Sequence, residues 1–272
     1  ADLISNVLNG NLVDFQGGVA SNAVPDLAHC VVKASLENLP QKENISLSTA
    51  GEGLVRIEGK GKAGHAAFPA GTVNAIGVIV DYLLENNLCT PEENGYLQLL
   101  QKLFAATDGS AIGIASDDGL FDPLTVIGGT IRMEEGRLIQ NINSRYPTST
   151  TAQTITSQLQ QAAGEHAEVK AERESEPFYI SADHPAIQTL LGVYNEVTGE
   201  SAKPFTMGGG TYARHFPLAV SFGPEAALGQ EQEVPDFVGT MHGPNEGVNL
   251  NHLTKALKIY LLSVLALQEI NL

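Results

Sequence analysis

Three polar side chains in the first two-thirds of the chain could act together on a small carbonyl-bearing or anionic ligand. His65 lies between small residues in GKAGHAAFPAG, at the end of an expected strand, so its imidazole has room to reach a ligand. Arg145 ends another expected strand in INSRYP, and a guanidinium there suits bidentate contact with a carboxylate. Asn22, in GGVASNAVPD, can hydrogen-bond a substrate or cap a turn before Pro25. The structural alternatives are a surface-loop histidine, a rim salt bridge and a turn cap.

A fourth candidate is a run of bare backbone amides. Gly208, Gly209 and Gly210 precede Thr211, and glycines let N–H groups approach an anion closely, with added help from the dipole where a helix begins. A phosphate loop is the weaker interpretation, because Tyr212 follows the threonine, no lysine stands beside the hydroxyl and the G-x-G-x-x-G spacing is absent. The run therefore predicts a site for an anion, with phosphate as the less favoured choice.

One histidine has the surroundings of a zinc ligand. His242 lies in the loop TMHGPNEG, where Asn245 or Glu246 could orient its imidazole. The alternative is a loop histidine that caps the local backbone. The chain contains no H-x-x-x-H, H-E-x-x-H or H-x-D spacing, and its adjacent carboxylates fall in expected turns or at an exposed helix start. The sequence thus offers at most one protein ligand for a metal.

Composition excludes several classes of partner. The 31 acidic against 15 basic residues give a net charge of -16, which opposes binding to nucleic acid. The two cysteines, Cys30 and Cys89, have apolar neighbours and no CxxC partner, so we expect buried thiols in a reducing compartment. No apolar run is expected to span a membrane, and no secretory signal pattern is found. We therefore expect a cytoplasmic protein without nucleic-acid or membrane partners.

Hairpins and helices alternate in the part of the chain that must position these residues. Proline and apolar spacing predict a short helix over 26–39. Alternating apolar residues predict two β-hairpins, and helical periodicity and a short apolar run predict further helices and a strand. The hairpins are expected at 45–61 and 125–147, the helices at 72–88, 95–104 and 151–164, and the strand at 168–174. This order predicts one or two split β-α-β units, with antiparallel sheets covered by helices on one face.

The pattern changes after Glu176 and Pro177. A helix with Pro185 in its first turn ends at Gly199, a short apolar run at 217–223 is typical of a strand in a mainly parallel sheet, and a last helix begins near Asn251. The last helix is expected to carry its leucines on one face. The fold class is therefore α/β with an α+β first part, and we expect a boundary between about 170 and 178.

Seven stretches together resemble the zinc-dependent aminoacylase/carboxypeptidase/dipeptidase superfamily, specifically its PepV-like dipeptidase branch. They occur in the family's order, from near the first residue to near the last. The stretches are GGVASNAVPD, GKGKAGHAAFPAGTVNAI, INSRYP, EPFYISADHP, MGGGTYAR, AVSFGPE and MHGPNE.

The resemblance implies both an architecture and roles for the candidate residues. In this family a lid of split β-α-β type is inserted into a catalytic domain that holds two metal ions bridged by water. The resemblance makes residues 1–172 the lid and 173–272 the C-terminal part of an α/β zinc-peptidase catalytic domain. It implies that His65 stabilises the developing oxyanion, that Asn22 and Arg145 hold the substrate, that the segment 208–211 binds the peptide's terminal carboxylate, and that His242 is the last metal ligand.

The chain also departs from the family pattern. The H-x-D strand end, the bridging aspartate, the paired glutamates and one further ligand precede the lid in the family and have no match here, and the lid's opening strand is expected ahead of Ala1. Catalytic zinc needs more protein donors than His242 alone can supply. We therefore interpret the chain as a portion of a dinuclear zinc dipeptidase that lacks the N-terminal half of the catalytic domain and is inactive alone.

Two other functions remain open at this stage. The chain could be a non-catalytic module that binds a carboxylate or peptide without a metal centre. It could also be an oligomerisation domain that pairs edge strands between subunits. The doubled hairpin and helix pattern favours an internal pseudo-dimer, and hence a monomeric complete enzyme acting on a small peptide.

Overall fold

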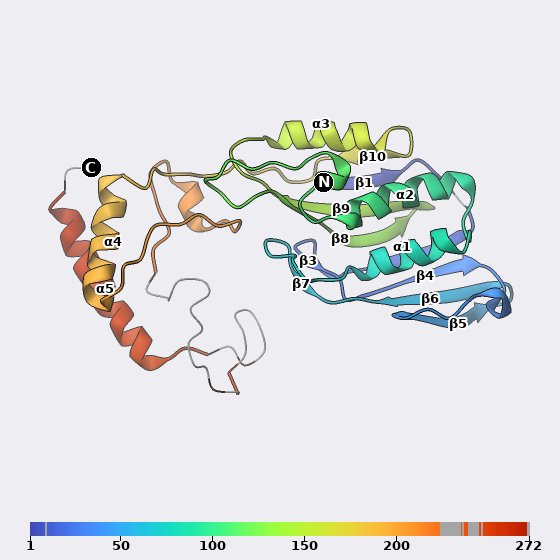
Figure 1. Cartoon of the computed structure of the whole chain (residues 1–272), viewed down its shortest axis with the longest axis horizontal. Helices are drawn as coiled ribbons and strands as arrows, with labels where there is room; N and C mark the ends of the chain where they lie inside the picture. The colour runs from blue at the N-terminus through green and yellow to red at the C-terminus, as the bar shows by residue number, and fades with distance from the viewer. Residues whose placement is uncertain (9, 224–234, 236, 239–244, 246, 271–272) are drawn as a thin grey trace. The chain divides into compact units, whose positions relative to one another are not determined.

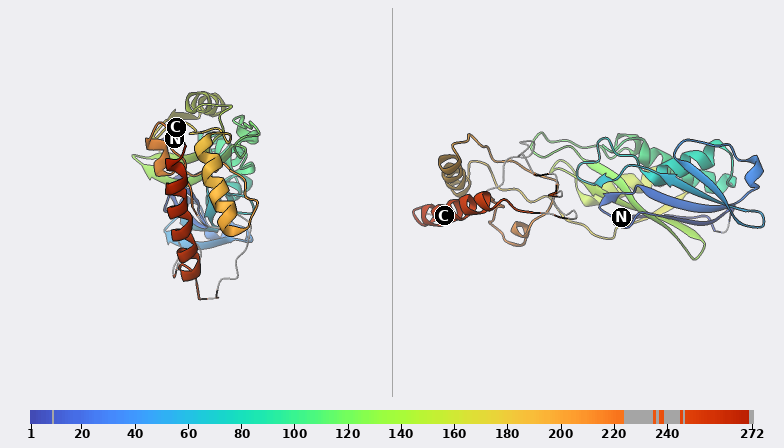
Figure 2. Two further views of the ribbon diagram at one scale, coloured as in Figure 1. Left: turned by 90° about the vertical axis from the view of Figure 1, so that its left-hand side faces the viewer. Right: turned by 90° about the horizontal axis from the view of Figure 1, so that it is seen from below.

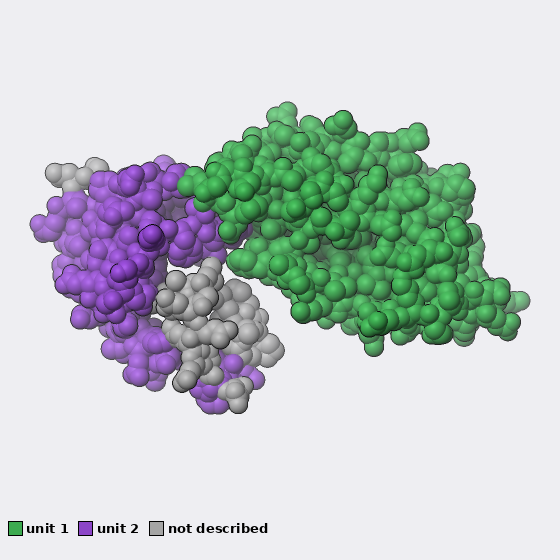
Figure 3. All heavy atoms as spheres, in the orientation of Figure 1, with its two compact units in different colours: residues 1–177 green, residues 178–272 purple. Residues whose placement is uncertain are grey.

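The computed structural model describes residues 1–8, 10–223, 235, 237–238, 245 and 247–270. It divides the chain into two compact units, Ala1–Pro177 and Phe178–Leu272, which Figure 3 colours separately. The sequence predicted a boundary between about 170 and 178, and the family resemblance placed it after residue 172. Each unit is described by itself below.

Unit 1 is built on an eight-stranded sheet in which every neighbouring pair is antiparallel (Figure 1). The strand order is β10-β1-β9-β8-β2-β4-β6-β5, and β3 and β7 form a separate two-stranded sheet. The strands are β1 (Asp2–Ser5), β2 (Leu12–Gly17), β3 (Ala23–Val24), β4 (Leu27–Lys33), β5 (Ile45–Gly51), β6 (Leu54–Lys60), β7 (Gly64–His65), β8 (Thr125–Glu134), β9 (Arg137–Arg145) and β10 (Ala167–Lys170). Single-turn 3-10 helices cover Leu36–Asn38 and Ser110–Ile112.

One half of this sheet is a split β-α-β unit. In the order β10-β1-β9-β8, α2 (Pro91–Ala105) precedes β8, and α3 (Ala152–Ala163) connects β9 to β10. The remaining strands and α1 (Ala75–Glu85) are inserted between β1 and α2. That second half has a single helix, so the described residues contain one split β-α-β unit, not two.

The three helices and the sheet share one hydrophobic core. Helix α1 packs on β4 and β6, α2 on β8 and α3 on β10, and Figures 1 and 2 show α1 and α2 side by side over the sheet. Side chains from both layers are fully buried in this core, among them Phe15, Ile57, Ile76, Tyr96 and Leu100. The tyrosine hydroxyl donates to the backbone oxygen of Leu3 at 2.7 Å, which attaches α2 to β1.

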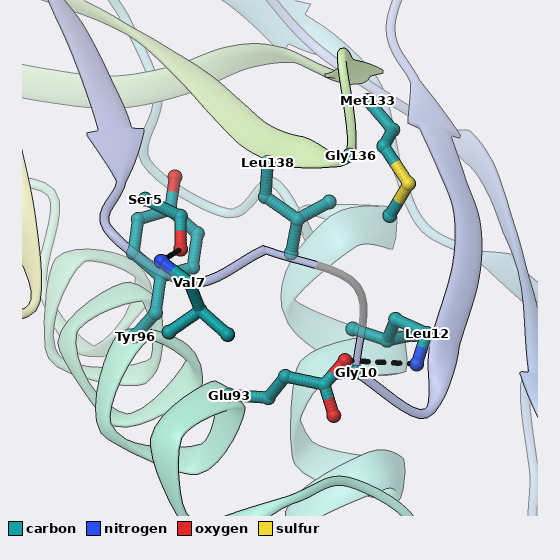
Figure 4. A pocket seen from close by; sticks show the side chains of 9 residues that line it. All are labelled: Ser5, Val7, Gly10, Leu12, Glu93, Tyr96, Met133, Gly136 and Leu138. Carbon is teal, nitrogen blue, oxygen red and sulfur yellow. Dashed lines mark hydrogen bonds between the residues drawn. The ribbon is translucent and has the colours of Figure 1, made fainter.

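A buried carboxylate attaches the start of α2 to the loop before β2. Glu93 is 5% exposed and accepts hydrogen bonds from the backbone N–H groups of Asn11 (3.0 Å), Leu12 (2.9 Å) and Thr90 (2.8 Å). Figure 4 shows this side chain passing Gly10, where an added Cβ would lie 2.1 Å from the carboxyl carbon. The cavity beside this side chain has a volume of ≈ 10 Å³, which leaves room for at most one water molecule. It is therefore not a ligand site.

The described residues of unit 2 form two α-helices that pack on each other. They are α4 (Pro185–Thr198), which is followed by Gly199 in the left-handed conformation (φ 76°), and α5 (Leu250–Gln268). The buried side chains are Leu190 and Tyr194 on α4 and Ala256, Ile259 and Ser263 on α5. A 3-10 helix covers Tyr212–His215.

The apolar stripe expected on the last helix is exposed. Leu253, Leu257, Leu261, Val264 and Leu265 are each more than half exposed (53–61%), while smaller or β-branched residues face α4. Among the described residues, α5 is the one helix whose length and mean hydropathy (1.2) would allow it to cross a membrane, which is weak support for a span. The expectation that no apolar run reaches that length is therefore corrected.

Three other sequence expectations were wrong. Residues 27–33 form a strand and not a helix, because Ala28, Cys30 and Val32 alternate into the core and the whole segment pairs with β6. The opening strand expected ahead of Ala1 is formed by β1 itself. Residues 217–223 form no strand, and unit 2 has no strand among its described residues with which this run could pair.

Both cysteines are buried, free thiols, as expected. Burial raises the pKa of Cys89 to about 12 and the pKa of Cys30 well above its usual value. At neutral pH both therefore remain protonated and unreactive.

Candidate functional site

The structure brings the predicted lid residues to one end of the sheet in unit 1. Ala23 in β3 pairs with His65 in β7, so that Asn22 and His65 lie on neighbouring segments. The backbone N–H of Ala66 donates to the Asn22 carbonyl at 3.0 Å, which fixes this neighbourhood.

A second contact joins this loop to the strand pair that carries Arg145. The hydroxyl of Thr125 donates to the Ala66 carbonyl at 3.0 Å, and Thr125 is the register partner of Arg145 in the β8–β9 ladder. The guanidinium Nε of Arg145 donates to Asn143 Oδ1 at 3.0 Å, which orients the side chain. Asn22 and Arg145, which are more than a hundred positions apart in the sequence, are therefore linked through Ala66 and Thr125.

The local hydrogen bond of His65 selects one state of its ring. The Ala67 backbone N–H donates to His65 Nδ1 at 3.2 Å, and only an unprotonated nitrogen accepts. The neutral ring then carries its proton on Nε2, which makes that nitrogen a hydrogen-bond donor. The His65 side chain is exposed on the surface of unit 1.

Small residues and a separate apolar cluster support the site from below. Val24, Ala66 and Ile127 are almost fully buried together, under the two-stranded sheet and against β8. An added Cβ at Gly18 (φ 75°) would lie 2.0 Å from the Gly129 carbonyl oxygen, so the turn before Asn22 packs directly on β8. The loops of the site are thus attached to the sheet and not suspended in solvent.

Asn22 makes its contact through the backbone. Its carbonyl accepts from Ala66, and no described residue hydrogen-bonds its exposed side-chain amide. The amide is therefore not used as a turn cap within the described part of the chain, and it can meet a ligand.

The loop beyond Arg145 is organised by a carboxylate. Asp118 accepts from the side-chain hydroxyl and backbone N–H of Thr148 and from the N–H groups of Phe121 and Leu120. These hydrogen bonds, the Thr148 hydroxyl first, hold the pKa of Asp118 well below its usual range.

The glycine run belongs to unit 2 and is described there alone. Gly208 to Gly210 lead into the 3-10 helix, which Thr211 caps by accepting from the Ala213 N–H at 3.3 Å. The Thr211 and Ser221 hydroxyls are hydrogen-bonded to each other. The guanidinium of Arg214 lies over Gly210, where an added Cβ would come within 2.7 Å of Nη1.

The described residues do not test the metal prediction, which assigned at most one protein ligand to this chain. They contain no group of three or more histidine, cysteine, aspartate or glutamate side chains that could hold a metal ion. His242 lies outside the described residues. The donors among the described residues do not by themselves form a zinc site.

Sequence reasoning missed three residues that lie beside the candidate groups. Phe68 is 54% exposed with its ring 6.5 Å from that of His65, and Arg214 adds positive charge to the glycine run. Phe68 follows the candidate histidine within GKAGHAAFPAG, and Arg214 follows the glycines within MGGGTYAR. Both could therefore have been proposed from the sequence. The role of Thr125 could not be seen in sequence, because it depends on long-range pairing.

An antiparallel sheet unit with histidine, arginine and asparagine at one end, joined to a second unit with a glycine run, is compatible with a small-molecule hydrolase. A model of Peptidase family M20/M25/M40 matches residues 17–266, and the chain belongs to this family. The superfamily resemblance of the seven motifs is thereby confirmed.

Two similar proteins are both named as dipeptidases. The chain is 29% identical to "Putative dipeptidase YtjP" of Bacillus subtilis over 265 residues, which is 92% of this chain and 54% of that protein. It is 27% identical to a "Putative dipeptidase" of Staphylococcus epidermidis over 269 residues, covering 94% of this chain and 55% of that protein. The chain therefore spans about half the length of the curated relatives it matches.

Proposed function

We propose that the chain is the lid and C-terminal catalytic portion of a metal-dependent dipeptidase, which hydrolyses a dipeptide or a similar small amide with a free carboxylate. The observation that carries the proposal is the convergence of Asn22, His65 and Arg145 at one end of the sheet in a member of a peptidase family. The relatives' names support the dipeptide as substrate.

Each converging group has a role that amide hydrolysis needs. Attack on the scissile carbonyl places negative charge on its oxygen, and the Nε2–H of His65 is a donor suited to stabilise that charge. The Arg145 guanidinium and the Asn22 amide hold polar groups of the substrate. The backbone of residues 208–211, with the Arg214 cation beside it, binds the terminal carboxylate in this proposal.

Metal dependence is proposed from the family resemblance, with two zinc ions in the complete enzyme and His242 as one ligand. The described residues do not supply the ligand set. No step of the mechanism is therefore assigned to the metal.

The proposal includes further polypeptide that completes the catalytic domain. Two observations support it: the relatives are nearly twice as long as the matched region, and α5 exposes a row of leucines in unit 2. Contiguous exposed apolar surface of this kind marks an interface in soluble proteins. We propose that the complete enzyme is cytoplasmic and monomeric.

A non-catalytic carboxylate- or peptide-binding module is the second candidate. It would require only the candidate substrate-binding groups and no metal-binding cluster, and the described residues contain no such cluster. The two candidates differ in turnover, because a binding module would bind a dipeptide saturably without releasing amino acids.

Steady-state hydrolysis of a dipeptide library by the full-length protein tests the proposal. His65→Ala should lower kcat by about 10²- to 10³-fold, the usual effect of removing one oxyanion donor. Arg145→Ala should instead raise KM by about 10-fold or more, since a charge-assisted contact to the substrate is lost. His29→Ala, at a histidine on β4, is the matched control and should leave both constants near wild type. An unchanged kcat in His65→Ala would refute the catalytic role.

A further inference from the structure

The loop that carries His65 is attached to β8 by two side-chain hydrogen bonds. Thr125 Oγ1 donates to the Ala66 carbonyl at 3.0 Å, and Asn74 Nδ2 donates to the Gly128 carbonyl at 2.8 Å. Asn74 also caps α1 through Ile76, so its contact secures the end of the loop. The threonine contact lies next to the histidine itself.

Thr125 lies between the two halves of the proposed site. Its backbone pairs with Arg145 as the first residue of β8, while its hydroxyl reaches the residue that follows His65. Ala66 makes hydrogen bonds with both of its backbone polar groups. Its N–H donates to the Asn22 carbonyl, and its own carbonyl accepts from the Thr125 hydroxyl. One threonine therefore connects the arginine strand to the histidine loop and, through Ala66, to the asparagine turn.

The surroundings make this contact difficult to replace. Thr125 is half-buried and Ala66 is 1% exposed, above the apolar side chains of Val24 and Ile127. A threonine in a strand is stiff about χ1, so its hydroxyl is held toward its acceptor. If the hydroxyl is removed, the carbonyl must find another partner or the loop must move.

We infer that Thr125 is a positioning residue, whose hydroxyl holds the imidazole of His65 at a fixed place relative to Arg145. The inference rests on the proposed function for its catalytic consequence, but the hydrogen bond can be tested separately. Displacing a donor by a fraction of an ångström lowers its contribution to a transition state more than it lowers substrate binding.

Amide hydrogen exchange on the 272-residue chain tests the attachment. Thr125→Val keeps the β-branched shape and removes the hydroxyl, and it should speed exchange at Ala66 and Ala67 by about 3- to 10-fold, the equivalent of one neutral hydrogen bond. Thr125→Ser keeps the hydroxyl and should restore the slow rate. Thr130→Val, on the same strand, is the matched control, since no described residue hydrogen-bonds its side chain. Unchanged β8–β9 amides report that the fold is intact.

Turnover by the full-length protein tests the consequence. Thr125→Val should lower kcat by about 10-fold with KM changed far less, and Thr125→Ser should recover most of the activity. The inference is overturned if exchange at Ala66 and Ala67 does not respond to the valine. It is also overturned if exchange accelerates while kcat stays at the wild-type value and His65→Ala is strongly impaired. If neither the Thr125 nor the His65 variant affects kcat, the proposed role of His65 fails, while the hydrogen-bond attachment stands.

Discussion

Replacing the buried carboxylate of α2 should destabilise unit 1 far more than replacing its exposed neighbour. Glu93→Gln preserves shape but leaves one acceptor oxygen where two oxygens now receive three N–H donors. The amide nitrogen must then face a backbone N–H, and an unsatisfied buried donor costs about 1–3 kcal/mol. The hydrogen bonds that remain are also weaker, because the amide oxygen carries no full charge. Together these two effects should lower the free energy of unfolding by about 2–3 kcal/mol.

Thermal and urea denaturation measure this loss. For a unit of this size, the midpoint temperature should fall by about 5–10 °C. Glu92→Gln is the matched control, because Glu92 is exposed one position earlier in the same first turn. It removes the same favourable charge near the helix N-terminus, and should cost less than about 1 kcal/mol. Equal losses in the two variants would show that the three backbone contacts of Glu93 contribute nothing beyond that helix-end charge.

Two further predictions concern pH and the exposed face of α5. The folded state lowers the pKa of Asp118, so its stabilising contribution is complete above its unfolded pKa of about 4 and is lost as pH falls toward the folded pKa. Asp118→Asn should therefore flatten the decrease in melting temperature on acidification below about pH 4, and a decrease as steep as that of the wild type would contradict this account. The double variant Leu257→Glu, Leu261→Glu should change the unfolding free energy of this chain by less than about 1 kcal/mol, since both side chains are about 60% exposed. In the full-length protein, where we propose that further polypeptide covers this face, the same variant should be destabilising by several times more. Equal effects in the two proteins would argue against a covering segment.

Periodicity predicted the elements that local interactions determine. Both hairpins form, and the second turns at Glu135 and Gly136 as expected, with positive φ at both residues. Helix α2 begins at a capping box between Thr90 and Glu93, although the sequence interpretation began that helix later. The helix expected over 26–39 failed because proline boundaries suit a strand equally well, and pairing with β6 determined the outcome.

The sequence predicted which residue types would form the candidate site, but it could not predict how they are arranged in space. Small neighbours around His65 and a strand-end arginine were visible, but their proximity results from strand register between β8 and β9 and from one threonine hydroxyl. The buried role of Glu93 was missed for a similar reason. The adjacent carboxylates at this helix start were expected to be solvated, but two of the three N–H groups that donate to Glu93 come from a segment about eighty residues earlier in the chain. Long-range partners of polar side chains leave little trace in local composition.

The strand order of unit 1 has a consequence for how the chain folds during synthesis. β1 lies between β9 and β10, with Ser5 opposite Ala167, so the first strand of this unit pairs with the last two strands of the same unit. Until that late segment emerges, β1 has no edge to join, and the inserted strands β2 to β6 can assemble first around α1. Closure of the sheet should therefore be the slow, final event, and a nascent chain halted near residue 150 should leave β1 unpaired and open to protease or chaperone.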